Sequence, residues 1–159
     1  MKGMHMDGRY QIFEGTIEKI IIESEDSGYC PPAPGQEIKQ RLTMRRNGNV
    51  SITRYFSGDF SKVSPTSGFK TMKRYHSKPT EKLMEYLAFY FGNPYTPEFV
   101  CDGGMWGIEL TNSEGRKFIY AGSLESEIVI GGLNISQIAR RVLEIEELWM
   151  FDGGMSDDL

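Results

Sequence analysis

Cysteine and histidine are scarce in this chain of 159 residues. The two cysteines, Cys30 and Cys101, are too few for a disulfide framework, and their spacing matches no common metal motif. The two histidines, His5 and His76, stand far apart, and the neighbours of His76 supply no acidic partner for a general base. We therefore expect free thiols in a reducing compartment, no metal site and no cofactor.

Long apolar runs are also missing. No run approaches the roughly 18 residues that a membrane-spanning helix needs, and residues 1–9 lack the apolar stretch of a secretion signal. We expect a cytoplasmic protein that does not associate with membranes. Apolar residues make up 39% of the chain and aromatic residues 12%, which favours a globular protein. The length predicts one domain over 1–159, with a flexible leader at 1–8 and an acidic tail at 154–159.

Catalytic motifs are absent as well. The chain has no Gly-x-Ser-x-Gly element, phosphate loop, dinucleotide-binding fingerprint or zinc pattern. The glycine pairs at 103–104 and 131–132 lack a following lysine and indicate turns. The acidic residues between 144 and 158 do not have the spacing of a calcium loop. We expect a protein without enzymatic activity and without catalytic residues.

What the chain does have is charge that is sorted by position. Between residues 37 and 82 there are eleven basic residues and three acidic ones, although the whole chain has a net charge of −4. The flanking segments are acidic. A basic middle raises the local potential for an anionic partner, but the same charges can also face the protein's own acidic segments.

Alternation, turn residues and helical spacing predict an α+β fold, with a mainly antiparallel sheet built from hairpins and two packing helices. Extended segments are expected at 9–23 (with a break at Gly15), 36–56, 68–75, 105–121, 127–130 and 148–151. The first helix is expected to begin after Ser77 and to end at Gly92. The second is expected to begin after Asn134, with Gln137 completing a capping box.

The two hairpins can be assigned a register from their turns. For 36–56 we favour a three-residue loop at 47–49 with Asn49 left-handed, which sets Met44 opposite Ile52 and gives one apolar and one polar face. The same logic for 105–121 places Gly115 in the left-handed position. One core is predicted to contain Leu87, Phe91, Ile108, Phe118, Ile138 and Val142, with Ile145 continuing the stripe of the second helix.

The candidate site is the basic, polar face of the first hairpin with its neighbours in sequence. Guanidinium groups beside an exposed aromatic ring suit phosphate contact and base stacking. The alternative is a solvated sheet face that the acidic segments neutralise. The candidate anion-binding or partner-binding residues are Arg41, Arg45, Arg46, Tyr55, Lys73 and Arg74.

A weak resemblance lies in the C-terminal part. Gly122-Ser123-Leu124, the segments 132–136 and 145–148, and Phe151-Asp152-Gly153 are together similar to an arrangement in uncharacterised bacterial and mobile-element proteins. The resemblance covers about a fifth of the chain and implies neither an activity nor a catalytic residue. It implies a bacterial or phage accessory protein.

The leading functional hypothesis is a non-catalytic binding protein that acts through protein–protein contact. One alternative is a phage or mobile-element inhibitor of a nucleic-acid-directed defence system. Others are a nucleotide-binding or nucleic-acid-binding protein that uses the basic hairpin, and an enzyme that uses His76 on a nucleotide. The expected partner is another protein, and a homo-oligomer is left open.

Overall fold

The computed structural model describes residues 10–26, 31–59, 63–97, 103–124 and 127–154. The predictions for His5, Cys30, Cys101, the leader 1–8 and most of the tail concern residues outside these ranges. In chain order the elements are β1 (Ile17–Glu25), β2 (Glu37–Arg45), β3 (Val50–Phe56), β4 (Phe69–Tyr75), α1 (Glu81–Phe91), β5 (Met105–Asn112), β6 (Lys117–Ser123), β7 (Val129–Ile130), β8 (Leu133–Asn134) and α2 (Ile135–Leu143).

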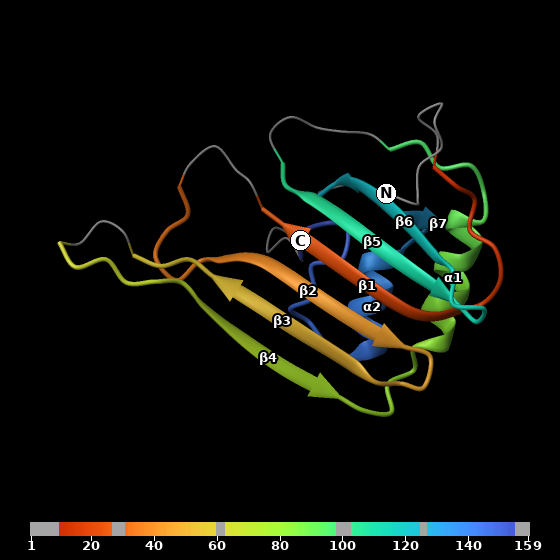
Figure 1. Cartoon of the computed structure of the whole chain (residues 1–159), viewed down its shortest axis with the longest axis horizontal. Coiled ribbons are helices and arrows are strands. Elements are labelled where there is room, and N and C mark those ends of the chain that lie inside the picture. The colour runs from red at the N-terminus through yellow and green to blue at the C-terminus, as the bar shows by residue number, and fades with distance from the viewer. Residues whose placement is uncertain (1–9, 27–30, 60–62, 98–102, 125–126, 155–159) are drawn as a thin grey trace.

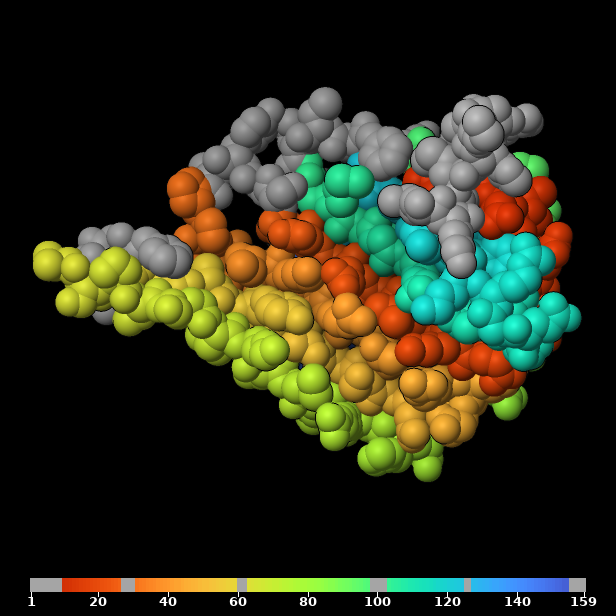
Figure 2. Space-filling model, in the orientation of Figure 1, coloured from red at the N-terminus to blue at the C-terminus, as the bar shows by residue number. Residues whose placement is uncertain are grey.

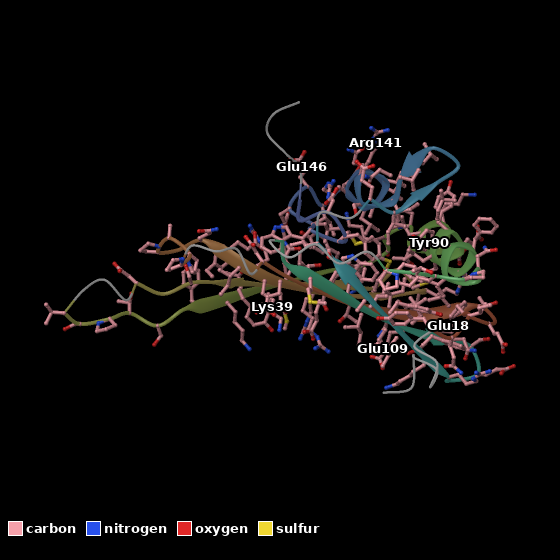
Figure 3. The ribbon with its side chains drawn as sticks, turned by 90° about the horizontal axis from the view of Figure 1, so that it is seen from above. Glu18, Lys39, Tyr90, Glu109, Arg141 and Glu146 are labelled. Carbon is pink, nitrogen blue, oxygen red and sulfur yellow. The ribbon has the colours of Figure 1, made fainter. Side chains whose placement is uncertain are left out.

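Six strands form one antiparallel sheet in the order β4-β3-β2-β1-β5-β6, while β7 and β8 form a separate small hairpin. Both helices lie on the same face of the large sheet, as Figures 1 and 3 show. The predicted α+β class, with a hairpin-built sheet and two helices, is confirmed. β4 and β6 are the edges, and the end of the β3–β4 ribbon projects beyond the rest of the molecule (Figure 2).

The β2–β3 hairpin corrects the predicted register. Met44 lies opposite Val50, not Ile52, because the three-residue loop occupies 46–48 and Gly48 takes the left-handed conformation at φ 96°. Glycine adopts positive φ without a Cβ clash, so it takes this position in preference to the neighbouring Asn49. The shift is two residues, which leaves every side chain on its predicted face.

The β5–β6 hairpin has the predicted register. Gly115 has φ 82°, and its N–H donates to the carbonyl oxygen of Asn112 at 3.0 Å. Leu110 lies opposite Phe118, and both point into the core. The asparagine before the loop also organises it, because its Oδ1 accepts hydrogen bonds from the N–H groups of Glu114 and Arg116.

The core lies between the sheet and the helices. Four of the six predicted members, Leu87, Phe91, Ile108 and Phe118, are buried in it. Ile138 and Val142 are only partly buried, and Val142 does not pack against the core. The predicted stripe is therefore wrong for Ile138 and Val142, whereas Ile145, which lies just beyond the end of α2, is buried in the core as predicted. The buried apolar residues of α2 itself are Ile135, Ala139 and Leu143.

Helix α1 begins at Glu81, not directly after Ser77. Thr80 precedes the first helical turn, but its hydroxyl donates to the carbonyl oxygen of Arg45 at 2.7 Å, and it makes no side-chain cap. Ser77 has φ 59°, and the N–H of Lys78 donates to Gly48. Residues 77–80 therefore tie α1 to the β2–β3 turn, which delays the start of the helix.

Two segments predicted to be extended are not strands. Residues 148–151 are irregular chain that ends in a turn, and Leu148, Met150 and Phe151 are buried without joining the sheet. At the N-terminal end the strand begins at Ile17, and 11–16 is not part of it. Hydrophobicity alone indicated strand for both segments, whereas they pack against the core as irregular chain.

Candidate partner-binding surface

The two helices leave the opposite face of the six-stranded sheet without helical cover in the described part of the chain (Figure 2). We call this the open face. Side chains alternate between the two faces of a strand, and the cross-strand pairs keep the alternation in phase. In Figure 3, Lys39 and Glu109 therefore lie on the opposite side of the sheet from Arg141 and Glu146.

Five basic residues of β2 and β4 lie on the open face, and they fall into two groups. Lys39 and Arg41 are neutralised by Glu23 of β1, at 3.1 and 2.6 Å. Arg45, Lys70 and Arg74 are exposed, and no ion pair joins them to a carboxylate among the residues that the structure describes. We call these last three the free cations.

Tyr55 lies between Lys39 and Lys70 in the cross-strand register. Its ring is half-buried, and the Lys39 ammonium lies 5.5 Å from the ring centroid. This contact is a cation–π interaction. One ring face is therefore occupied within the protein, which leaves Tyr55 less suited to stack on a base.

Two of the six candidate residues are not on the open face. The Arg46 side chain lies in the β2–β3 turn, where its Nε donates to the carbonyl oxygen of Ile17 at 2.7 Å. Lys73 points to the helix side, over the ring of Tyr75 at 5.2 Å. Consecutive strand residues face opposite ways, so Lys73 and Arg74 cannot share a face. The structure brings Arg41, Arg45, Tyr55 and Arg74 together.

Arg54 adds to the positive charge of the segment but is neutralised on the helix side. Its guanidinium donates two hydrogen bonds to Glu37, at 3.0 and 2.9 Å. These bonds raise the pKa of Arg54 above its ordinary value, against the opposing effect of burial. Gln40 donates to the same carboxylate and to the carbonyl oxygen of Glu147, which links the sheet to the C-terminal turns. This cation is structural.

Strand β4 was underestimated as part of the site. Lys70 and Met72 share the open face with Arg74, and Met72 is 58% exposed. Six of the seven β4 residues are exposed, so the two described helices leave this strand largely uncovered. The signal was present in the sequence, because alternation from Arg74 places Met72 and Lys70 on the same face.

A groove lies on the helix side, beneath β4. Its volume is about 840 Å³, and it runs between the strand and the C-terminal half of α2. The lining carries both signs of charge. It consists of Lys73, Tyr75, Gln137, Arg140, Arg141, Glu144, Glu146 and Glu147.

His76 and the possible metal ligands were the remaining candidates for chemistry in the described part of the chain. His76 is exposed, and its Nδ1 lies 3.0 Å from the amide oxygen of Asn49, with no carboxylate in the pair. No cluster of three or more metal-ligating side chains occurs in the described ranges. Neither described helix has the length and apolarity that a membrane crossing requires.

Comparisons with known proteins add no relative. The chain matches no protein-family model, no curated protein and no solved structure.

Proposed function

We propose that this protein is a non-catalytic binding protein whose open face, on strands β2 to β4, binds an acidic protein partner. One observation carries the proposal. Arg45, Lys70 and Arg74 lie on an uncovered sheet face without a described carboxylate partner, whereas Lys39 and Arg41 beside them share Glu23. Exposed cations without a carboxylate partner attract an anionic surface, and their positions set the orientation in which it docks.

The surroundings favour a protein over a nucleic acid. The acidic residues of the same face do not discriminate between the two, because Glu23 is paired with Lys39 and Arg41, and Glu109 is paired with Lys117 at 3.3 Å. The ring of Tyr55 is occupied by Lys39, which removes one stacking surface. Met72, in contrast, offers an exposed flexible apolar contact between Lys70 and Arg74, as in many protein-binding surfaces.

The defence-inhibitor alternative depends only on the C-terminal resemblance, to which the comparisons add nothing. It specifies no surface on this fold, and we keep it only as a biological setting for the binding function. A cytoplasmic location belongs to the proposal and is supported by the scarcity of cysteine and of apolar runs.

The test is direct binding of two labelled polyanions, a short polyglutamate and an oligodeoxythymidylate, measured by fluorescence anisotropy. We expect polyglutamate to bind, and its affinity to fall as salt rises. Arg45→Glu/Arg74→Glu should weaken it by at least about tenfold. The matched control is Lys82→Glu/Arg116→Glu, which makes the same change in net charge outside the open face and should leave the affinity within about threefold.

Three results would contradict the proposal. Equal binding of polyglutamate by the two double variants would assign the attraction to overall charge. Tighter binding of the oligonucleotide, lost in Arg45→Glu/Arg74→Glu, would assign the face to nucleic acid. If neither polyglutamate nor the oligonucleotide binds, the free cations are only a solvated surface.

A further inference from the structure

The outer edge of β4 is free. β4 ends the sheet, and no described segment forms a backbone hydrogen bond with its outer side. All seven of its residues pair with β3 without a register shift, and the strand contains no proline. Edge strands are usually protected by bulges, prolines, short length or charge. Of these devices β4 has only charge, so its backbone is accessible to a further strand.

The hydrogen-bond pattern identifies which residues present that edge. The N–H of Arg45 donates to the carbonyl oxygen of Asn49 at 2.9 Å, which fixes the phase of the β2–β3 ladder. Residues of an antiparallel strand bond alternately to the two sides. Ser51, Thr53 and Tyr55 of β3 therefore bond to β2, and the residues between them bond to β4. On β4, the residues opposite Ser51, Thr53 and Tyr55 are Arg74, Met72 and Lys70, so their N–H and C=O groups point away from the sheet.

The side chains of the same three residues lie on the open face. Two of these residues, Lys70 and Arg74, therefore carry both a free cation and outward backbone groups. β4 carries three basic residues and no acidic one. Two β4 strands paired with each other would bring like charges together, which is unfavourable, whereas an acidic strand would form opposite-charge pairs. The charge therefore opposes a second copy of this chain and favours an acidic segment.

We propose that β4 accepts an extended acidic segment of the partner protein as a seventh, antiparallel strand. The inference rests on the proposed function and specifies how the partner is bound. Acidic side chains lie opposite Lys70 and Arg74, and an apolar side chain lies opposite Met72. These positions are alternate residues on one face, so the segment has the pattern acidic-x-apolar-x-acidic.

The other face of the added strand has room as well. Its intervening side chains point to the helix side, next to the groove of about 840 Å³ beneath β4. Lys73 and Tyr75 line this groove from the strand, and Gln137 and Arg141 line it from α2. The helices therefore do not block a strand at this edge.

The experiment uses the full chain and a labelled peptide, Thr-Glu-Thr-Leu-Thr-Glu-Thr. In the proposed register the leucine N–H points to β4, and the N–H of the threonine that follows it points to solvent. N-methylation of the leucine should weaken binding by at least about tenfold, while N-methylation of that threonine should change it by less than about threefold. A peptide of the same composition with one glutamate moved by one position should also bind more weakly.

A matched pair of variants tests the protein side. Met72→Pro removes an outward N–H that β3 does not use, so the fold should persist while peptide binding is lost. Met72→Ala keeps the N–H and should retain binding within about threefold. Circular dichroism and the unfolding midpoint establish that both variants are folded. If Met72→Pro does not fold, the two N-methylated peptides still decide the question on the wild-type protein.

Several outcomes overturn the inference. Equal binding of both N-methylated peptides, with loss of binding in Arg45→Glu/Arg74→Glu, would leave the acidic partner in place and exclude strand addition. Absence of binding by both the peptide and polyglutamate would remove the proposed function too. Sedimentation showing a dimer that Met72→Pro dissociates would assign the edge to a second copy of the chain.

Discussion

Removal of the Asp152 carboxylate should destabilise the protein far more than the loss of any exposed ion pair. Arg140 on α2 donates to both carboxylate oxygens of Asp152, at 2.9 and 2.8 Å, and also to the carbonyl oxygen of Leu148 at 3.0 Å. The side chains are only 4% and 16% exposed. This pair fastens residues 144–152 to α2, and Phe151 packs edge-on against Trp106 within the same region.

The magnitude follows from burial. Asp152→Ala leaves a guanidinium buried without its counter-charge, which typically costs about 3 to 5 kcal/mol. The variant also loses the hydrogen bond from the Gly154 N–H to Oδ1, a further contribution of about 1 kcal/mol. Glu23→Gln is the control, because the side chains of Glu23, Lys39 and Arg41 are 31% to 45% exposed, and ion pairs at the surface contribute about 0 to 1 kcal/mol.

Urea unfolding followed by circular dichroism measures both variants. The double variant Arg140→Met/Asp152→Ala should be more stable than Asp152→Ala alone, because it removes the buried charge together with its partner. If Asp152→Ala costs no more than Glu23→Gln, the C-terminal turns are held by apolar packing and the reasoning fails. A double variant as unstable as the sum of its single variants would likewise show that the two side chains are not coupled.

Three further predictions concern the core. Gly122→Ala should lower the free energy of unfolding by about 1 to 3 kcal/mol, because the new Cβ would lie 2.6 Å from the buried ring of Trp106. An unchanged melting temperature would contradict this packing. Burial raises the pKa of Tyr120, so the tyrosine loses its proton at lower pH in the unfolded chain than in the folded protein. The free energy of unfolding should therefore fall as pH rises above about 10. Tyr120→Phe should make this fall less steep in unfolding measured from about pH 8 to 11. Leu143→Ala should cost about 2 to 5 kcal/mol and Val142→Ala less than about 1 kcal/mol in urea unfolding, and the reverse order would restore the originally expected helix face.

The two hairpins show where sequence reasoning succeeds. The loop before Arg116 contains a single glycine, so Gly115 determined the register without ambiguity. The loop after Arg45 offers both Gly48 and Asn49 for the left-handed position. Alternation cannot distinguish these choices, because a shift of two residues keeps all side chains on the same faces. The face was therefore predictable, and the pairing was not.

The second helix shows a different limit. Asn134 caps it as predicted, and its Oδ1 accepts the Gln137 N–H at 3.2 Å. Leu133, the residue before the cap, does not set the buried face, because it lies in the β7–β8 hairpin and is 48% exposed. Capping specifies where a helix begins, whereas the rotation about its axis depends on tertiary neighbours that sequence spacing does not identify.

The candidate site was predictable as a face but not as a set of free charges. Alternation placed Arg41, Arg45 and Tyr55 together correctly. The neutralisation of Arg41 by Glu23 depends on the pairing of β1 with β2, which no local pattern specifies. Arg54 is similar, since its partner Glu37 becomes a neighbour only through the irregular pairing at the start of β2.

The number of helices explains why free charge gathers on β4. Six strands spaced by about 4.8 Å make a sheet about 24 Å across, whereas two helices side by side, each about 10 Å wide, cover about 20 Å. The exposure of six of its seven residues shows that β4 is the edge strand left outside the helical layer. A strand that is exposed to solvent on both faces has no apolar face to bury. β4 accordingly carries Lys70 and Arg74 on one face and Lys73 on the other. Among the described strands none lies beyond it to supply a carboxylate. Its basic charge is therefore left for a partner or for solvent, which the paired N-methylated peptides distinguish.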